Sequence, residues 1–194
     1  MTTFATTQNT NLRIKKLAIA GMLVAVGILV PMFSPIRVLI EPASFTLASH
    51  AVIFIAMFIS PLMAVAVAVG TTIGFQLGGF PLIIVLRAAT HVVFAFLGSY
   101  YLHRVAAKPL SFVSARVFSF VVGLIHAVGE VVVVSVFFFG GNINPMSLEQ
   151  GFFTSVLLLI GVGSVIHSMV DFEIARLVVL PLKRHRSLAS LFKV

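Results

Sequence analysis

The chain has 194 residues, of which 60% are hydrophobic and only 9% charged, with a net charge of +8 and no cysteine. An average soluble domain is about 25% charged, so the composition excludes an ordinary soluble enzyme and a disordered regulator. The missing cysteines exclude disulfides and cysteine-based metal or catalytic sites. The basic residues lie between apolar runs, which is typical of an integral membrane protein and not of one that binds nucleic acid.

The apolar runs predict an all-α bundle of six membrane-spanning helices. A helix needs about 20 apolar residues to cross a hydrocarbon core about 30 Å thick. The polar residues 1–12 are expected to form a disordered tail, 13–186 a single transmembrane domain, and 187–194 a cytoplasmic tail. The expected spans are 14–33, 45–60, 61–78, 81–102, 112–139 and 151–175. Five spans, with the short second and third merged, are the alternative.

The positive charges predict that both termini are cytoplasmic, because Lys and Arg concentrate in the cytoplasmic loops of membrane proteins. They cluster before the first span, between the fourth and fifth spans, and after the sixth, whereas the other loops carry only Arg37. The clusters are Arg13, Lys15 and Lys16; Arg104, Lys108 and Arg116; and Lys183, Arg184, Arg186 and Lys193. Six spans place all three clusters on one side, whereas five would place one of them outside.

Two pairs of ionisable residues lie within the fourth and fifth predicted spans. Arg87 and His91 are four residues apart, as are His126 and Glu130, so each pair shares a helix face. Both pairs lie roughly 9 to 20 Å below the outer helix ends, and His50 lies roughly 8 Å below the outer end of the second span. Ionisable residues at membrane depth are functional candidates, so the sequence predicts a polar chamber open to the outside.

We expect this chamber to be roofed by the loop at 35–44 and by the loop that carries Asn142 and Asn144, whose amides can contact a ligand. Arg87 suits a small solute with a carboxylate, because a guanidinium can hold a carboxylate in a bidentate fork. The open alternative is a structural ion pair between Arg87 and Glu130, with the histidines bonded to backbone carbonyls.

The other ionisable residues of the sixth span are expected to be structural. His167 lies deep in the membrane and without a companion, so a structural role is expected for it. Asp171, Glu173 and Arg176 are expected at the inner, interfacial end of the span, where Glu173 and Arg176 form a surface pair.

The chain lacks a Walker motif, so we do not expect an enzyme that hydrolyses ATP. We assign neither a metal nor a cofactor to the chamber. Haem held by two facing histidines remains an alternative, as does a self-contained, proton-coupled carrier, although the chain is short for an inverted-repeat carrier.

The first span carries small side chains at Ala18, Gly21 and Ala25. This spacing lets a second helix approach closely. A small protein with a ligand chamber and no ATPase of its own suggests a partner chain that supplies the energy. Packing within the bundle is the alternative use of these residues.

The chain resembles the substrate-binding S components of energy-coupling factor transporters, which import vitamins into bacteria. The resemblance covers residues 12–186 and rests on size, six spans, inside termini and the small residues of the first span. Short stretches also look like the niacin and pantothenate members. These stretches are Pro42–His50 followed by Phe54–Pro61, Gly78–Pro81 and Leu86–Arg87.

This resemblance implies a multi-pass protein of the bacterial plasma membrane that captures a vitamin from outside. Such proteins dock on a transmembrane T subunit, which couples them to two cytosolic ATPases. The family's Ala-xxx-Ala docking motif corresponds here to Gly21-Met-Leu-Val-Ala25, and its outer-half pocket corresponds to the predicted chamber.

The resemblance leaves the vitamin open between pantothenate and nicotinate, which are both carboxylates and so both suit Arg87. Pantothenate would use Asn142, Asn144 and Glu130 for its hydroxyl and amide groups. The flat nicotinate ring would favour stacking, for which the available side chains are Phe45, Phe80 and Phe138.

Overall fold

The structure is a computed structural model that describes residues 2–105, 110–185 and 188–192. Lys108, Arg186 and Lys193, which belong to the predicted basic clusters, lie outside the described residues. The long helices are α1 Thr2–Phe33, α3 Pro61–Leu77, α4 Leu82–Tyr100, α5 Phe112–Phe139 and α7 Gly163–Arg184. The shorter elements are β1 Arg37–Ile40, β2 Ala43–Thr46, α2 Ala51–Met57, η1 Tyr101–Val105, α6 Pro145–Glu149, η2 Phe153–Val162 and η3 Ala189–Leu191.

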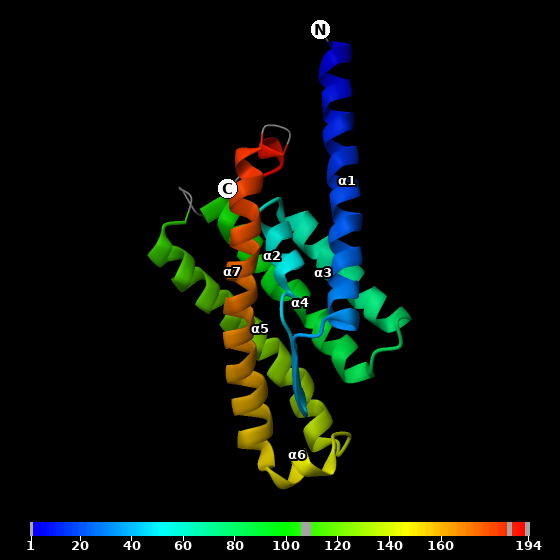
Figure 1. Cartoon of the computed structure of the whole chain (residues 1–194), viewed down its shortest axis with the longest axis vertical. Helices are drawn as coiled ribbons and strands as arrows, with labels where there is room; N and C mark the ends of the chain where they lie inside the picture. The colour runs from blue at the N-terminus through cyan, green and yellow to red at the C-terminus, as the bar shows by residue number, and fades with distance from the viewer. Residues whose placement is uncertain (1, 106–109, 186–187, 193–194) are drawn as a thin grey trace.

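Four continuous helical segments in the described part of the chain are long and apolar enough to cross a membrane. They are Leu12–Phe33, Leu82–Arg104, Phe112–Phe139 and Phe153–Arg184, and a shorter apolar helix is α3. The four segments and α3 together coincide with five of the six predicted spans, and they pack side by side as a bundle (Figure 1). The all-α membrane architecture is confirmed, whereas the count of six crossings stays a prediction.

The predicted span over 45–60 is wrong as a single helix. Residues 43–46 form β2, which pairs with β1 as an antiparallel hairpin, and only seven residues of α2 follow. A seven-residue helix rises about 10 Å, a third of the hydrocarbon thickness. The chain then breaks at Ser60, whose side chain accepts a hydrogen bond from Met63 N and starts α3.

Helix α2 lies at the centre of the bundle, and this position explains its uniformly apolar sequence. Six of its seven residues are buried, as expected for a helix that is hydrophobic on every side. Phe54 of α2, Phe94 of α4 and Phe172 of α7 are fully buried and pack together as the aromatic centre of the core.

The structure describes helical residues within both predicted tails. Helix α1 begins at Thr2, so residues 2–12, which the sequence predicts as a disordered tail, are part of this helix. Leu191 of η3 is 1% exposed, so part of the predicted tail at 187–194 packs back on the bundle.

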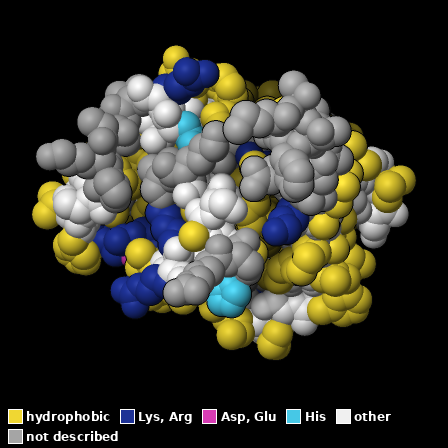
Figure 2. Space-filling view, turned by 90° about the horizontal axis from the view of Figure 1, so that it is seen from above, with side chains coloured by type: hydrophobic (Ala, Val, Ile, Leu, Met, Phe, Trp, Pro, Cys, Tyr) yellow, Lys and Arg dark blue, Asp and Glu magenta, His cyan; other side chains and the backbone are white. Residues whose placement is uncertain are grey.

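The start of α1 and the end of α7 lie at the same end of the molecule (Figure 1). Figure 2 looks onto this end and shows Lys and Arg side chains on it, with Asp and Glu barely visible. This arrangement agrees with the predicted clustering of positive charge on one side.

Glycines in α3 let that helix approach α1 closely. A Cβ on Gly74 would lie 2.1 Å from Ile28 Cδ1, and one on Gly70 would lie 2.6 Å from Val24 Cγ2. These positions therefore serve packing within the bundle. Gly21 differs, because a Cβ there would meet nothing within 4 Å.

Candidate functional site

Close packing of α4 against α5 brings Arg87 and Glu130 together. A Cβ on Gly129 of α5 would lie 2.8 Å from Thr90 Oγ1 of α4. The Thr90 side chain therefore packs directly against the backbone of α5 at this level. Arg87 Nε donates to Glu130 Oε2 at 2.7 Å, and Arg87 Nη2 contacts the same oxygen. Arg87 is 6% exposed and Glu130 2%, so this is a buried ion pair.

The second oxygen of Glu130 faces two histidines. His91 Nε2 lies 3.3 Å and His126 Nε2 lies 3.4 Å from Glu130 Oε1. From α7, Ser164 Oγ donates to Glu130 Oε2 at 3.3 Å. The two helix faces predicted from the i,i+4 spacings therefore meet, and Glu130 is their common partner.

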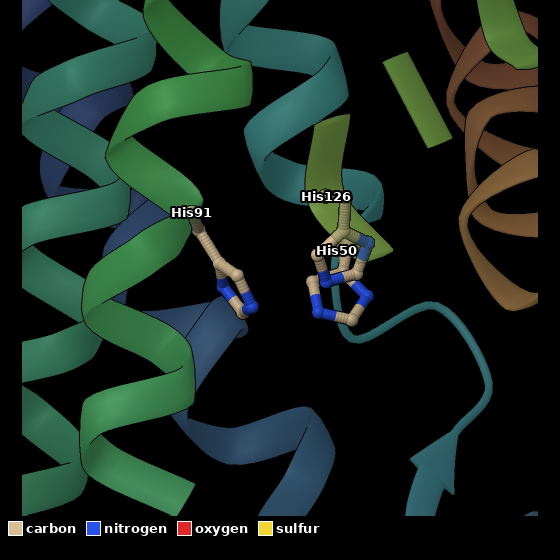
Figure 3. Close-up of side chains that lie close together, drawn as sticks. All are labelled: His50, His91 and His126. Atoms are coloured by element: carbon tan, nitrogen blue, oxygen red, sulfur yellow. The ribbon is translucent and has the colours of Figure 1, made fainter. Parts of the chain in front are cut away.

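His50 joins this group from the residue before α2. Its ring centroid lies 4.5 Å from that of His91 and 4.6 Å from that of His126, and Figure 3 shows the three rings gathered in one place. The three histidines, with Arg87 and Glu130, line a pocket. Five of the seven residues that we expected to bind substrate are thus brought together.

Aromatic side chains form part of the pocket wall. Phe45 of β2, Phe75 of α3 and Phe80 line it. Phe45 packs on the backbone of α7, where a Cβ on Gly163 would lie 2.6 Å from Phe45 Cζ. Phe138, the third candidate for stacking, instead packs against other rings at the end of α5.

Asp171 does not lie at an interfacial helix end, as the sequence analysis expected, but is fully buried. Its carboxylate accepts hydrogen bonds from Ala48 N at 2.7 Å and from His50 N at 2.8 Å. Its Oδ2 also lies 3.2 Å from His50 Nδ1. Asp171 therefore fixes the turn that presents His50 to the pocket.

His167 is likewise not an isolated structural residue. It lines the pocket, its ring centroid lies 4.9 Å from that of His50, and its Nε2 lies 3.1 Å from Ser49 Oγ. The spacing of Ser164, His167 and Asp171 along one helix face was the signal that could have revealed this wall.

The error came from the length of the last span. The helical segment runs over Phe153–Arg184, not 151–175, because α7 continues to Arg184. Asp171 is therefore about 27 Å along the helix from its start and about 20 Å from its end. Glu173 and Arg176 do pair as expected, with Nη1 3.1 Å from Oε2.

Asn142 and Asn144 do not line the pocket. Asn142 Nδ2 donates to Gly140 O at 3.0 Å within its own loop. Asn144 caps α6 by accepting from Ser147 N at 2.7 Å, and its amide also contacts the Glu41 side chain. These contacts join the loop after α5 to the hairpin, so the two expected roof segments do meet.

The fold and the pocket define a multi-pass membrane protein. Its buried cavity is lined by ionisable side chains and suits a small polar solute. Neither a protein-family model nor a solved structure matches the chain. A curated relative, however, narrows the class of membrane protein to a type of transporter. The chain is 42% identical over 169 residues to the niacin transporter NiaX of Lactococcus lactis subsp. cremoris (strain MG1363). The alignment covers 87% of this chain and 75% of that protein.

This chain therefore belongs to the family of that niacin transporter, which confirms the resemblance to niacin-type S components drawn from the sequence. It is a transport protein of the bacterial plasma membrane.

Proposed function

We propose that this chain is an S component that captures niacin, as the nicotinate anion, outside the cell. The observation that carries the proposal is a buried arginine in a pocket with aromatic walls, in a chain 42% identical to a niacin transporter. Arg87 would hold the carboxylate of nicotinate. A guanidinium has five N–H donors, and Glu130 engages only Nε and Nη2, so the outer edge of the group remains for a substrate.

Nicotinate fits this pocket better than pantothenate does. Phe45 and Phe80 offer faces on which a flat pyridine ring can stack. Pantothenate would need amide partners, and Asn142 and Asn144 are engaged in the loops instead. His50, His91 and His126 supply the remaining polar wall.

Import is proposed to depend on partner proteins. Ala18, Gly21 and Ala25 are exposed on α1, whereas Val24 and Ile28 of the same helix pack against the glycines of α3. We propose that this stripe docks on a transmembrane T subunit, with two cytosolic ATPases supplying the energy, in a six-span topology with both termini inside.

The first test is to purify the chain alone in detergent, denature it and identify the released small molecules by mass spectrometry. Stoichiometric nicotinate is expected, and titration should then rank nicotinate above pantothenate and above nicotinamide, which lacks the carboxylate. Saturable binding of pantothenate with no binding of nicotinate would overturn the substrate assignment.

A second test separates an S component from a self-contained carrier. The chain in liposomes with a pH gradient and no ATPase should not accumulate nicotinate, whereas addition of the T subunit, both ATPases and ATP should start uptake. Accumulation by the isolated chain would favour the proton-coupled carrier.

A further inference from the structure

The three clustered histidines differ from ordinary buried histidines in how they face one another. The three come from different parts of the chain and all line the pocket: His50, His91 and His126. Of these, His91 is 5% exposed and His126 is 2% exposed. One ring nitrogen from each lies within 4.8 Å of the other two. Figure 3 shows the rings converging on a common space.

Carboxylates behind the rings orient two of these histidines. His50 Nδ1 lies 3.2 Å from Asp171 Oδ2, and His91 Nε2 lies 3.3 Å from Glu130 Oε1. A ring N–H bonded to a carboxylate leaves the opposite nitrogen with a lone pair directed away from it. This is the outer-shell arrangement that supports metal-ligating histidines.

The third histidine has ring nitrogens that the described part of the protein does not satisfy. His126 is 2% exposed; its Nδ1 has no hydrogen-bond partner among the described residues, and its Nε2 lies 3.4 Å from Glu130 Oε1 without making a hydrogen bond. Leaving a buried polar group unpaired costs about 1–3 kcal/mol. A buried polar atom without a partner in a native protein needs an explanation. Coordination of a metal ion by the lone pair of the imidazole ring is such an explanation.

We propose that His50, His91 and His126 bind one divalent transition-metal ion of the zinc type at the floor of the pocket. Neutral imidazoles suit such ions, and three protein ligands leave one position open. Zinc–nitrogen bonds of about 2.0–2.1 Å require the three nitrogens to lie about 3.3 Å apart. The nitrogens lie within 4.8 Å of one another, so binding would require the side chains to rotate about their χ angles and draw them closer together.

The charge balance of the pocket favours a cation at this place. Among the described residues that line the pocket, Arg87 is the one Lys or Arg side chain. It already faces Glu130, and the buried Asp171 adds a second carboxylate behind His50. A bound anion would bring the sum to minus two with neutral histidines, and a divalent ion restores neutrality.

If the proposed function holds, the open position of the metal faces the substrate. The pyridine nitrogen of nicotinate is a ligand of the same kind as imidazole, and the carboxylate on the ring would then reach toward Arg87. The metal would thus select a heteroaromatic nitrogen over a carbocyclic ring, so benzoate should bind more weakly than nicotinate.

A second group on the same wall competes for the assignment. His50, His167 and Asp171 also place one ligand atom each within 4.8 Å of one another. Asp171, however, already accepts hydrogen bonds from Ala48 N and His50 N, so a metal there would disrupt the turn before α2. Variants of His126 and His167 separate the two groups.

The test uses the full chain in detergent, carrying an affinity tag without histidines. The protein is stripped with EDTA and titrated with Zn²⁺ by calorimetry, and with Co²⁺ by absorption spectroscopy. We expect one equivalent of Zn²⁺ and the ligand-field bands of four-coordinate Co²⁺. Loss of an outer-shell partner costs 10–100-fold in metal affinity, so His91→Gln and His126→Gln should each cost more than about 100-fold. The matched control, His185→Gln, alters an exposed histidine and should change nothing.

Several outcomes would overturn the proposal. They are no Zn²⁺ binding by the wild-type chain, unchanged affinity in folded His126→Gln, and loss of binding in His167→Gln but not in His126→Gln. If a variant does not fold, X-ray absorption on the zinc-loaded wild-type chain decides, because it should report three imidazole ligands. Nicotinate is titrated into the stripped and the zinc-loaded protein alongside. Nicotinate binding without Zn²⁺ binding refutes the metal and keeps the proposed function, whereas Zn²⁺ binding without nicotinate binding does the reverse.

Discussion

Replacing Arg87 by alanine tests the substrate assignment most directly. A hydrogen bond to a charged group contributes about 1.5–3 kcal/mol, and charge-assisted pairs are the strongest of these. Arg87 is 6% exposed, so water cannot replace the lost contact fully. We therefore expect nicotinate binding to weaken by about 2 kcal/mol or more, which is a factor of about 30 in Kd.

The same substitution also destabilises the fold, and this effect must be separated from the loss of binding. Removing one partner of a buried pair leaves an uncompensated charge and costs about 3–5 kcal/mol, here on Glu130, which is 2% exposed. The double variant Arg87→Ala, Glu130→Gln removes that charge. It should unfold at a higher temperature than Arg87→Ala and still bind nicotinate weakly.

Calorimetric titration of nicotinate in detergent, with thermal unfolding of each variant, provides both measurements. Arg116→Ala is the matched control, because Arg116 pairs with Glu173 while its side chain is 36% exposed and does not line the pocket. Its nicotinate affinity should equal that of the wild type. An unchanged Kd in the folded Arg87→Ala protein would refute the carboxylate contact and leave Arg87 as a purely structural partner of Glu130.

The other substitutions examine docking, packing, the His50 turn and stacking. Gly21→Leu should leave nicotinate binding and the unfolding temperature intact but prevent co-purification with the T subunit; lost binding with intact assembly would contradict this. Gly74→Leu should instead destabilise the chain by about 1–3 kcal/mol in thermal unfolding, because a Cβ there would meet Ile28 Cδ1 at 2.1 Å. Asp171→Ala should lower stability by about 3 kcal/mol or more, because two hydrogen bonds to a charged acceptor are lost; an unchanged unfolding temperature would argue against the anchoring role. Phe45→Ala should weaken nicotinate about tenfold if the ring stacks there, and equal affinities in titration would remove Phe45 from the site.

The centre of the pocket could be predicted from sequence because it depends on helix periodicity alone. Arg87 with His91, and His126 with Glu130, lie four residues apart on long apolar helices, and depth follows from counting residues. This reasoning needs the helix ends only to within a turn. The meeting of both pairs at Glu130 was therefore within reach of the sequence.

The other side of the pocket could not be predicted, because it depends on where elements end. Apolar residues around 45–60 indicate burial, but a core helix and a membrane-spanning helix look alike over so short a run. Asp171 was placed at an interface because the last helix was ended nine residues too early, at 175 and not at Arg184. The small residues of α1 are a second case in which the sequence does not show which side of a helix is packed. Gly21 and Gly27 look alike in sequence. A Cβ on Gly27 would lie 2.4 Å from Thr71 Cγ2, whereas one on Gly21 would meet nothing within 4 Å.

The buried charges also explain why Arg87 should matter beyond one hydrogen bond. Glu130 pairs with Arg87 and also faces two histidines, whereas the buried Asp171 faces His50 and His167. An anionic substrate entering the pocket adds to their charge in a medium that screens poorly. If the proposed function holds, Arg87 and the metal ion proposed at the histidines are the positive charges that offset the substrate's negative charge. Because Arg87→Ala alone leaves Glu130 without its charge partner, the remaining affinity of the double variant Arg87→Ala, Glu130→Gln measures how much the histidine cluster supplies.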